Sequence, residues 1–446
     1  MDEDEMTAGG LTVGVVNPEA VIIADEDDGG VIIDFAPSDV EEAIPFDANL
    51  AEHMDEGDLS ALATDLIGSY DEDRASRSDW EEAYIDGLDL LGVKIEDRTT
   101  PFDGATGVSH PILSEAVIRF VSQAMMEIFP PNGPVRTTVI GKKSVEKDEQ
   151  ARRVQDYMNY LLTEEIEEYR PSTEQLLFKT ALSGSGFRKV YYDPTFDRPD
   201  SIFVPAEDFV ISYDTTDLKS SPRYTHVMRK SDNFVRRMQL NGFYRDVALG
   251  DPADESSDIQ TKYNELTGVT EVSQTDVRTL LEMFVELDLE GFEHEGDTGE
   301  PTGLSLPYVV TIDHASSKVL SIRRNYKEDD PLTQPHQHFV HYKFQPGLGF
   351  YGFGLIHLIG SIAKSSTSIL RQLIDAGTLA NLPAGFKARG LRIKGDDRPI
   401  EPGEFRDIDL PGGAIRDNIL PLPFKEPSGT LAQLMGVLVD EGRRIA

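Results

Sequence analysis

The chain has 446 residues and a formal net charge of −38, from 80 Asp and Glu against 42 Lys and Arg. So acidic a protein repels phosphate backbones, which argues against a conventional DNA-binding module that neutralises phosphates with Lys and Arg. The absence of cysteine excludes disulfides, thiol nucleophiles and cysteine-based zinc sites. The acidic start of the chain is unlike a signal peptide, and no apolar run of about 18 residues occurs. We therefore expect a soluble protein, synthesised in the cytoplasm, with no membrane partner.

Residues 1–60 are predicted to form an acidic, mostly disordered arm. The first 73 residues contain 22 Asp and Glu and no Lys or Arg. Blocks of like charge with little apolar content usually stay solvated. Short apolar patches such as Val31-Ile32-Ile33 could instead add to a neighbouring chain as strands.

Helical periodicity begins near residue 61. A short amphipathic segment at 79–91 and a loop at 99–108 precede the clearest helix of the chain, predicted at 113–128. Its apolar residues recur at i, i+3, i+4 and i+7, which places them on one core-facing side: Leu113, Ala116, Val117, Phe120, Val121, Ala124, Met125 and Ile128. The proline-rich segment 130–134 ends this helix.

The middle of the chain mixes helices and strands. The first predicted elements here are a long charged helix at 144–169 capped by Ser144 and a helix from Pro171 to Gly184. A strand at 187–192 and further strands within 201–230 follow. A short helix at 233–240 and an acidic surface insertion at 247–278 come next. Residues 281–290 alternate apolar with acidic side chains, which predicts a half-exposed strand. A hairpin is predicted from 308–312 and 319–322. Helices followed by antiparallel strands indicate the α+β class.

The sequence contains no convergent set of catalytic residues, so we expect no enzyme, cofactor or metal. The carboxylates of 281–290 lie about 7 Å apart on an extended strand, and a solvated polar face explains them. His336 and His338 would share one face of a strand while His341 points the other way, which is poor geometry for a metal site. An acidic metal-dependent enzyme that uses His336, His338 and these carboxylates remains the less favoured alternative.

The segment 339–355, Phe-Val-His-Tyr-Lys-Phe-Gln-Pro-Gly-Leu-Gly-Phe-Tyr-Gly-Phe-Gly-Leu, joins a strand to a long helix through a turn of glycines and aromatics. Glycines permit close backbone approach, and the aromatics between them can anchor the turn to a core. The helix predicted at 356–379 carries a polar strip of Ser361, Ser365 and Ser368 opposite an apolar side. Such a strip suits either a helix packed among identical neighbours or an ordinary helix–helix contact.

With this segment and the helix after it, the sequence resembles podovirus-type portal proteins, the head-to-tail connectors of tailed bacteriophages. Pro205-Ala206-Glu207-Asp208-Phe209, which leads to Asp214, supports the resemblance, and it extends over roughly residues 61–446. The resemblance implies a ring, usually of twelve subunits, at one vertex of the capsid. It further implies a conduit for packaging and ejecting double-stranded DNA, with the major capsid protein, the terminase large subunit and a tail adaptor protein as partners.

Carried onto this chain, the resemblance implies a wing domain of helices and antiparallel sheet at 61–355, a first stem helix at 356–379, a small α/β clip at 380–427 and the start of a second stem helix at 428–446. The channel loop and crown of such proteins would lie beyond residue 446. Candidate channel-lining residues are Ser361, Lys364, Ser365, Ser368 and Arg371. Candidate clip contacts with DNA or the packaging motor are Lys387, Arg389, Arg392, Lys394 and Arg398; these side chains could equally pair with acidic residues of neighbouring subunits. The structural alternative is another virion component, such as a tail adaptor or capsid-associated protein.

Overall fold

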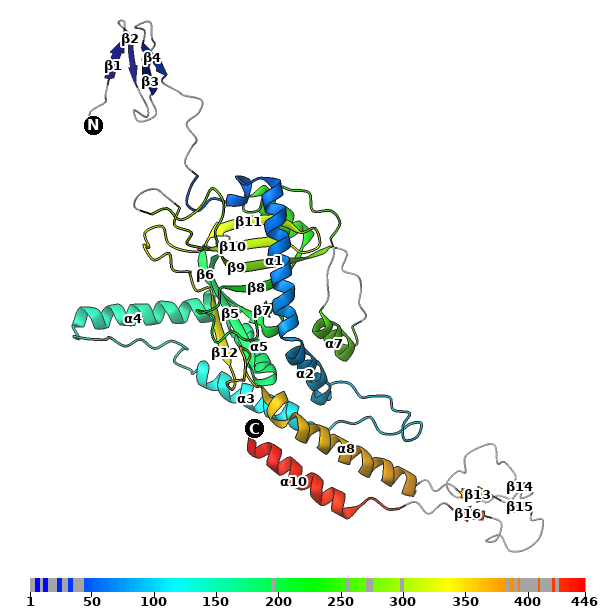
Figure 1. Cartoon of the computed structure of the whole chain (residues 1–446). Coiled ribbons are helices and arrows are strands. Elements are labelled where there is room, and N and C mark those ends of the chain that lie inside the picture. Colours follow the sequence, from blue (N-terminus) through cyan, green and yellow to red (C-terminus); the bar gives the residue numbers. More distant parts are fainter. Residues whose placement is uncertain are drawn as a thin grey trace. The chain divides into compact units, whose positions relative to one another are not determined.

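A computed structural model describes residues 44–193, 197–252, 257–269, 276–296, 301–381 and 425–445, together with the backbone of short strands outside these ranges (Figure 1). The chain divides into two units, Met1–Ala48 and Asn49–Ala446. The fold is a mixture of helices and antiparallel sheets, as expected for the α+β class.

The first unit contains two antiparallel hairpins in the segment predicted to be mostly disordered. Strand β1 (Glu5–Ala8) pairs with β2 (Leu11–Gly14), and β3 (Ile22–Asp25) pairs with β4 (Val31–Asp34). The apolar patch at 31–33 therefore pairs within its own chain.

The second unit begins twelve residues before the expected wing boundary at 61. The short helix η2 (Leu50–Glu52) and helix α1 (Glu56–Ser76) both start in the segment assigned to the arm. Asn49 explains the earlier start, because its buried amide donates to Leu320 O at 3.1 Å and accepts from Ile322 N at 2.9 Å. These bonds attach the segment to strand β11 (Lys318–Arg324).

Two antiparallel sheets form the centre of this unit. The larger has the order β11-β10-β9-β8-β7, with β10 at Leu306–Asp313, β9 at Val277–Leu287, β8 at Arg223–Ser231 and β7 at Phe209–Val210. The smaller has the order β12-β5-β6, with β12 at Phe339–Lys343, β5 at Ser185–Asp193 and β6 at Arg198–Pro205. Stacked and edge-on rings join the two sheets, including Phe187 on Phe209 at 4.0 Å between centroids and Phe284 on Phe339 at 5.4 Å. The predicted hairpin is confirmed as β10–β11.

The half-exposed strand predicted at 281–290 is confirmed in part: β9 ends at Leu287, and Glu286, Asp288 and Glu290 are exposed as expected, but the prediction is wrong at Glu282. Strand β9 lies in the middle of the larger sheet, and Glu282 on its supposedly exposed face is mostly buried. Lys189 of β5 covers it, with Nζ 2.6 Å from Glu282 Oε1. The alternation of apolar and acidic residues correctly predicted the two faces of the strand. It could not show that Lys189 covers the acidic face at Glu282.

Helices pack against the sheets and form much of the remaining core. Helix α3 (Ile112–Ile128) confirms the clearest sequence prediction, with Leu113, Val117 and Val121 buried. Helices α2 (Ser78–Leu88), α5 (Tyr169–Ser183) and α6 (Asp232–Leu240) also lie where helices were expected.

The helix predicted at 144–169 is shorter in the structure. Helix α4 (Val145–Tyr160) starts with Ser144 as its N-cap, as predicted, and is followed by the π-helical turn η4 (Leu161–Glu165). Leu161 and Ile166 are buried, so the chain bends here to bring both into the core.

The acidic segment 247–278 is more than a surface insertion. It contains helix α7 (Asp258–Thr267), which packs on α2 and buries Ile259. Tyr263 of this helix hydrogen-bonds Tyr84 through the two hydroxyls at 2.8 Å. None of the helices in the described ranges combines the length and apolarity that a membrane span requires.

Candidate functional site

The glycine–aromatic turn that precedes the longest helix is a point where four parts of the chain meet. Glycines 352 and 354 lie against the backbone of Gly184, at the end of α5. A Cβ on Gly354 would stand 2.2 Å from Leu182 O, and one on Gly352 would stand 2.4 Å from Gly184 O. Only glycine permits this approach, as the sequence pattern predicted.

Buried aromatics and one arginine hold this turn in the core. Phe350 and Tyr351 are fully buried, and Tyr351 stacks on Trp80 at 4.6 Å. Arg77 donates to the Tyr351 hydroxyl at 2.8 Å and to Phe209 O at 2.8 Å. Burial alone would lower the pKa of Arg77, but the nearby Tyr351 and Glu81 hold it above its usual value. The turn is thereby fixed to α2 and to the start of β7.

Helix α8 (Leu355–Asn381) leaves this turn and confirms that a helix occupies the predicted range 356–379. At the start of this helix, Nδ1 of His357 accepts a hydrogen bond from the backbone N–H of Gly354 at 3.1 Å. Ile356, Ile359, Ala363 and Ile369 face inward. The opposite side is exposed and carries four of the predicted channel-lining residues: Ser361, Lys364, Ser365 and Ser368.

Helix α10 (Gly429–Ile445) runs back along α8, so a helix occupies the range expected at 428–446 (Figure 1). Ser428 caps it by accepting from Leu431 N at 3.4 Å. Gly377 approaches Pro427 at one end of the pair, and Gly442 approaches Ile362 at the other, so the helices are antiparallel. Gly442 is the one buried residue of α10, and Leu434 and Val437 are exposed.

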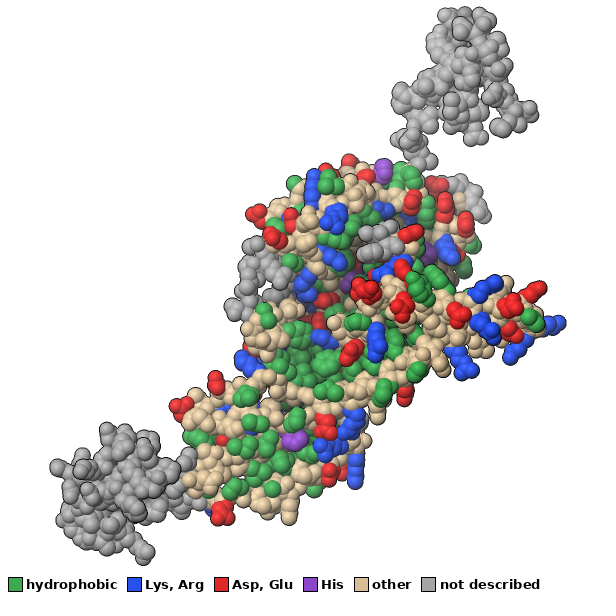
Figure 2. Space-filling view, turned by 180° about the vertical axis from the view of Figure 1, so that it is seen from behind, with side chains coloured by type: hydrophobic (Ala, Val, Ile, Leu, Met, Phe, Trp, Pro, Cys, Tyr) green, Lys and Arg blue, Asp and Glu red, His purple; other side chains and the backbone are tan. Residues whose placement is uncertain are grey.

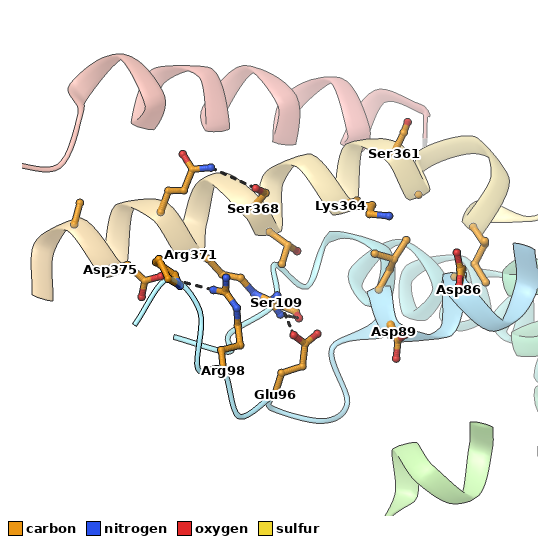
Figure 3. Close-up of a pocket in the computed structure, with 18 of the residues that line it drawn as sticks. Asp86, Asp89, Glu96, Arg98, Ser109, Ser361, Lys364, Ser368, Arg371 and Asp375 are labelled. Atoms are coloured by element: carbon orange, nitrogen blue, oxygen red, sulfur yellow. Dashed lines mark hydrogen bonds and ion pairs between the residues drawn. The ribbon is translucent and has the colours of Figure 1, made fainter. Parts of the chain in front are cut away.

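A groove of about 810 Å³ runs between α8 and the segment 83–109 (Figure 3). Its α8 wall includes Ser361, Lys364 and Ser368, and Asp86 and Asp89 lie across from them. Alanine, leucine, proline and phenylalanine side chains line much of the rest. The groove is thus lined by apolar side chains together with charged side chains of both signs.

The structure corrects the role expected for Arg371. Its guanidinium turns toward the loop at 96–109, where Nε donates to Val108 O at 2.8 Å and Nη1 meets Glu96 Oε2 at 3.0 Å (Figure 3). Asp375, one turn further on, accepts from Thr106 N at 2.8 Å. Arg371 therefore anchors this loop to α8, whereas an exposed charge on the helix was expected from the sequence.

The five candidate clip residues cannot be placed. Arg389, Lys394 and Arg398 lie outside the described residues, and the side chains of Lys387 and Arg392 are outside them as well, although their backbones belong to short strands β13 (Gly385–Lys387) and β14 (Arg392–Ile393).

The residues of the alternative enzyme site have other partners. Glu282 accepts from Lys189 and lies 2.9 Å from His226 Nδ1. Burial alone would raise its pKa, but the Lys189 charge and the His226 hydrogen bond outweigh it and lower the pKa to about 2. A carboxylate held so firmly ionised is a structural partner of Lys189.

The histidines do not converge on a metal. His338 Nε2 lies 2.9 Å from Asn325 Oδ1, and His341 Nε2 lies 3.0 Å from Ser185 Oγ. Burial, with a smaller contribution from Lys343, lowers the pKa of His341 to about 3, so it is a neutral ring stacked on Phe187. Within the described ranges, no three His, Cys, Asp or Glu residues are grouped to hold a metal ion.

A loop was expected at 99–108, but its contacts with α8 were not predicted from the sequence. Two ion pairs join the loop at 96–109 to α8: Arg98 Nη1 lies 3.6 Å from Asp375 Oδ2, and Glu96 pairs with Arg371. The only nearby sequence feature that could have indicated this close contact was the pair of glycines at 104 and 107. A Cβ on Gly107 would stand 1.7 Å from Glu96 O.

No protein-family model matches the chain, and no curated protein matches it either. The class supported by the described residues is an α+β protein in which a two-sheet body carries a pair of antiparallel helices.

Proposed function

We propose that this chain is a portal protein, the ring-forming head-to-tail connector of a tailed bacteriophage. The observation that carries the proposal is the glycine–aromatic turn. It locks a long helix to the body, and that helix pairs with α10 while leaving a small, polar side exposed. The resemblance of the same segment to podovirus-type portal proteins gives this arrangement its functional meaning.

In the proposed ring, α8 and α10 form the stem, and the exposed side of α8 with Ser361, Ser365 and Ser368 faces the channel. The serine hydroxyl groups carry no positive charge that would bind the phosphates of a DNA duplex. The strongly negative net charge of the protein lowers its affinity for these phosphates further. DNA can then slide during packaging and ejection. Lys364 would supply one cation per subunit.

The proposed position is one capsid vertex of the virion, after synthesis in the host bacterial cytoplasm. The body would contact the major capsid protein, and the end of the stem would receive the terminase large subunit and then the tail adaptor. The channel would pass double-stranded DNA. Chemistry is not required for this function, since the energy of packaging would come from the motor.

The test is the assembly state of the purified protein. Native mass spectrometry should give a single closed oligomer, with twelve copies as the expected number, and averaged electron micrographs should contain rings with a bore wider than the roughly 20 Å of a DNA duplex. A protein that stays monomeric across salt and concentration, or rings without a central hole, would refute the proposal. Rings found only beneath the capsid vertex would instead indicate a tail adaptor.

A further inference from the structure

The segment at 134–160 projects from the body as an extended stretch followed by α4 (Figure 1). From here on, "the arm" means this segment and not the N-terminal residues 1–60. No residue of α4 is buried. Asn159 and Gln155 hold the extended stretch to the helix, through bonds to Val135 N at 2.8 Å and Thr137 N at 3.2 Å. A helix of this length without tertiary packing is only marginally stable in water.

The arm exposes apolar side chains that a free surface would normally bury. Ile140 is 95% exposed and Val145 is 75% exposed, and Val154, Tyr157 and Tyr160 are each more than half exposed. Clustered exposure of this kind marks a protein-interaction surface.

The arm is also basic in a chain of net charge −38. It holds six Lys and Arg against four Asp and Glu. The six are Arg136, Lys142, Lys143, Lys147, Arg152 and Arg153, and Figure 2 shows Lys and Arg side chains along this projection. Among the residues that the structure describes, none of the six has an ion-pair partner.

The same chain offers a surface of opposite charge on α1 and α2. A carboxylate stands at every seventh residue along these two consecutive helices, and all five are exposed: Asp58, Asp65, Glu72, Asp79 and Asp86. Seven residues are nearly two helical turns, so these carboxylates follow one side of each helix. Arg74 is the one Lys or Arg within α1 and α2, and Arg77 between them is buried. Glu72 pairs with Arg223 at 3.4 Å and Asp86 also lines the groove beside α8, so Asp58, Asp65 and Asp79 are the carboxylates of this stripe that carry the argument.

We propose that the arm docks on the α1–α2 carboxylate stripe of a second copy of this chain. Two different, complementary surfaces on one chain produce head-to-tail contacts, and such contacts close into rings when the rotation between subunits allows it. Charge complementarity favours this occupant over DNA or another protein, because the basic arm and the acidic stripe both belong to the chain. The inference rests on the proposed function and adds the contact that joins subunits.

The experiment exchanges charges across the contact. Lys142→Glu/Lys147→Glu reverses the arm, Asp65→Lys/Asp79→Lys reverses the stripe, and Lys219→Glu/Lys327→Glu changes two exposed lysines elsewhere as a matched control. Native mass spectrometry and sedimentation measure assembly of the full chain, and circular dichroism checks folding. We expect each reversal to raise the concentration needed for half assembly about ten-fold or more, because like charges then face each other.

Two rescues distinguish a contact from general damage. The chain that carries both reversals should assemble like the wild type. An equal mixture of the arm variant and the stripe variant should form rings that contain the two in equal number, since each arm then meets a complementary stripe only on the other variant. The control variant should assemble normally.

The outcomes separate this inference from the ring proposal. Wild-type rings that the arm reversal leaves unchanged would overturn the inference alone, and so would an arm variant that assembles normally but loses binding to duplex DNA or to capsid shells. Open or dimeric complexes that depend on the arm charges would support the inference and refute the ring. A wild-type protein that never self-associates would refute both.

Discussion

The body around the two sheets and the parts that extend from it are stabilised in different ways. The body buries complete side chains such as Tyr84, Phe187 and Tyr308, and it encloses ion pairs such as Lys189–Glu282. Helix α10 buries one glycine, and α4 buries nothing. Apolar burial is the main source of folding free energy, so the body contributes more to the stability of the chain than α4 or α10 does. In the proposed ring, the exposed surfaces of α4 and α10 are those that a neighbouring subunit would cover.

The largest effect on the body is expected from Arg77→Met. The substitution leaves the buried carbonyl of Phe209 and the hydroxyl of Tyr351 without their charged donor. Loss of a buried charged partner should lower the free energy of unfolding by about 4 kcal/mol. Urea denaturation measures this, and Arg119→Met is the control, because its exposed pair with Glu115 should contribute less than about 1 kcal/mol. Equal losses in the two variants would contradict the account.

Acid should weaken the body through Glu282. Its folded pKa of about 2 lies below its ordinary value of 4.5, so its ionised form stabilises the fold above pH 4.5. That contribution, about 3 kcal/mol, disappears as the pH falls from 4.5 toward 2.

The check for Glu282 compares unfolding free energies at pH 7 and pH 3. Glu282→Gln should be less stable than the wild type at pH 7, since Lys189 then lacks its partner, and the gap should narrow at pH 3. Glu286→Gln, on an exposed position of the same strand, should follow the wild type. A gap that is constant with pH would show that the ionisation of Glu282 does not stabilise the sheet.

A methyl group at the turn should weaken the packing that joins α8 to the body. In Gly354→Ala the new Cβ meets the backbone of residues 182 and 184, which cannot swing away as a side chain would. We expect a loss of about 2 kcal/mol, measured by urea denaturation. Gly436→Ala in α10 has open space around the new atom and should be neutral or stabilising. Similar losses from both would mean that the turn is not tightly packed.

The smallest expected change in stability distinguishes the roles of Arg371 and Lys364, two cationic residues on α8. Arg371→Gln should cost about 1 kcal/mol and raise the hydrogen exchange of the loop at 96–109, because it removes the bonds to Val108 and Glu96. Lys364→Gln should leave both the stability and the loop unchanged, since Lys364 is exposed. Loop exchange that rises with Lys364→Gln instead would reverse these assignments.

Local patterns in the sequence predicted local structure well. Periodicity located α3, a helix was expected where α8 lies, and the glycines before α8 indicated a close backbone approach that the structure confirms. Each of these signals lies within a few residues of the feature that it predicts.

Partners distant in sequence were beyond such reasoning. Glu282 was expected on a solvated face, and its partner Lys189 lies 93 residues away. Arg371 was expected in the channel, and its carbonyl partner at Val108 lies 263 residues away. A charged residue on the polar side of a helix or strand gives the same sequence pattern whether water or a distant part of the chain contacts it. The pattern alone therefore cannot predict such partners.

The most direct test of the central claim locates the exposed side of α8 in the assembled particle. The chain has no cysteine, so Ser365→Cys creates a single thiol that can carry a maleimide-linked gold cluster. Electron micrographs averaged along the ring axis should place the gold inside the bore. Gold at the outer rim, or label that attaches only to unassembled protein and never to a ring with a central channel, would contradict the account.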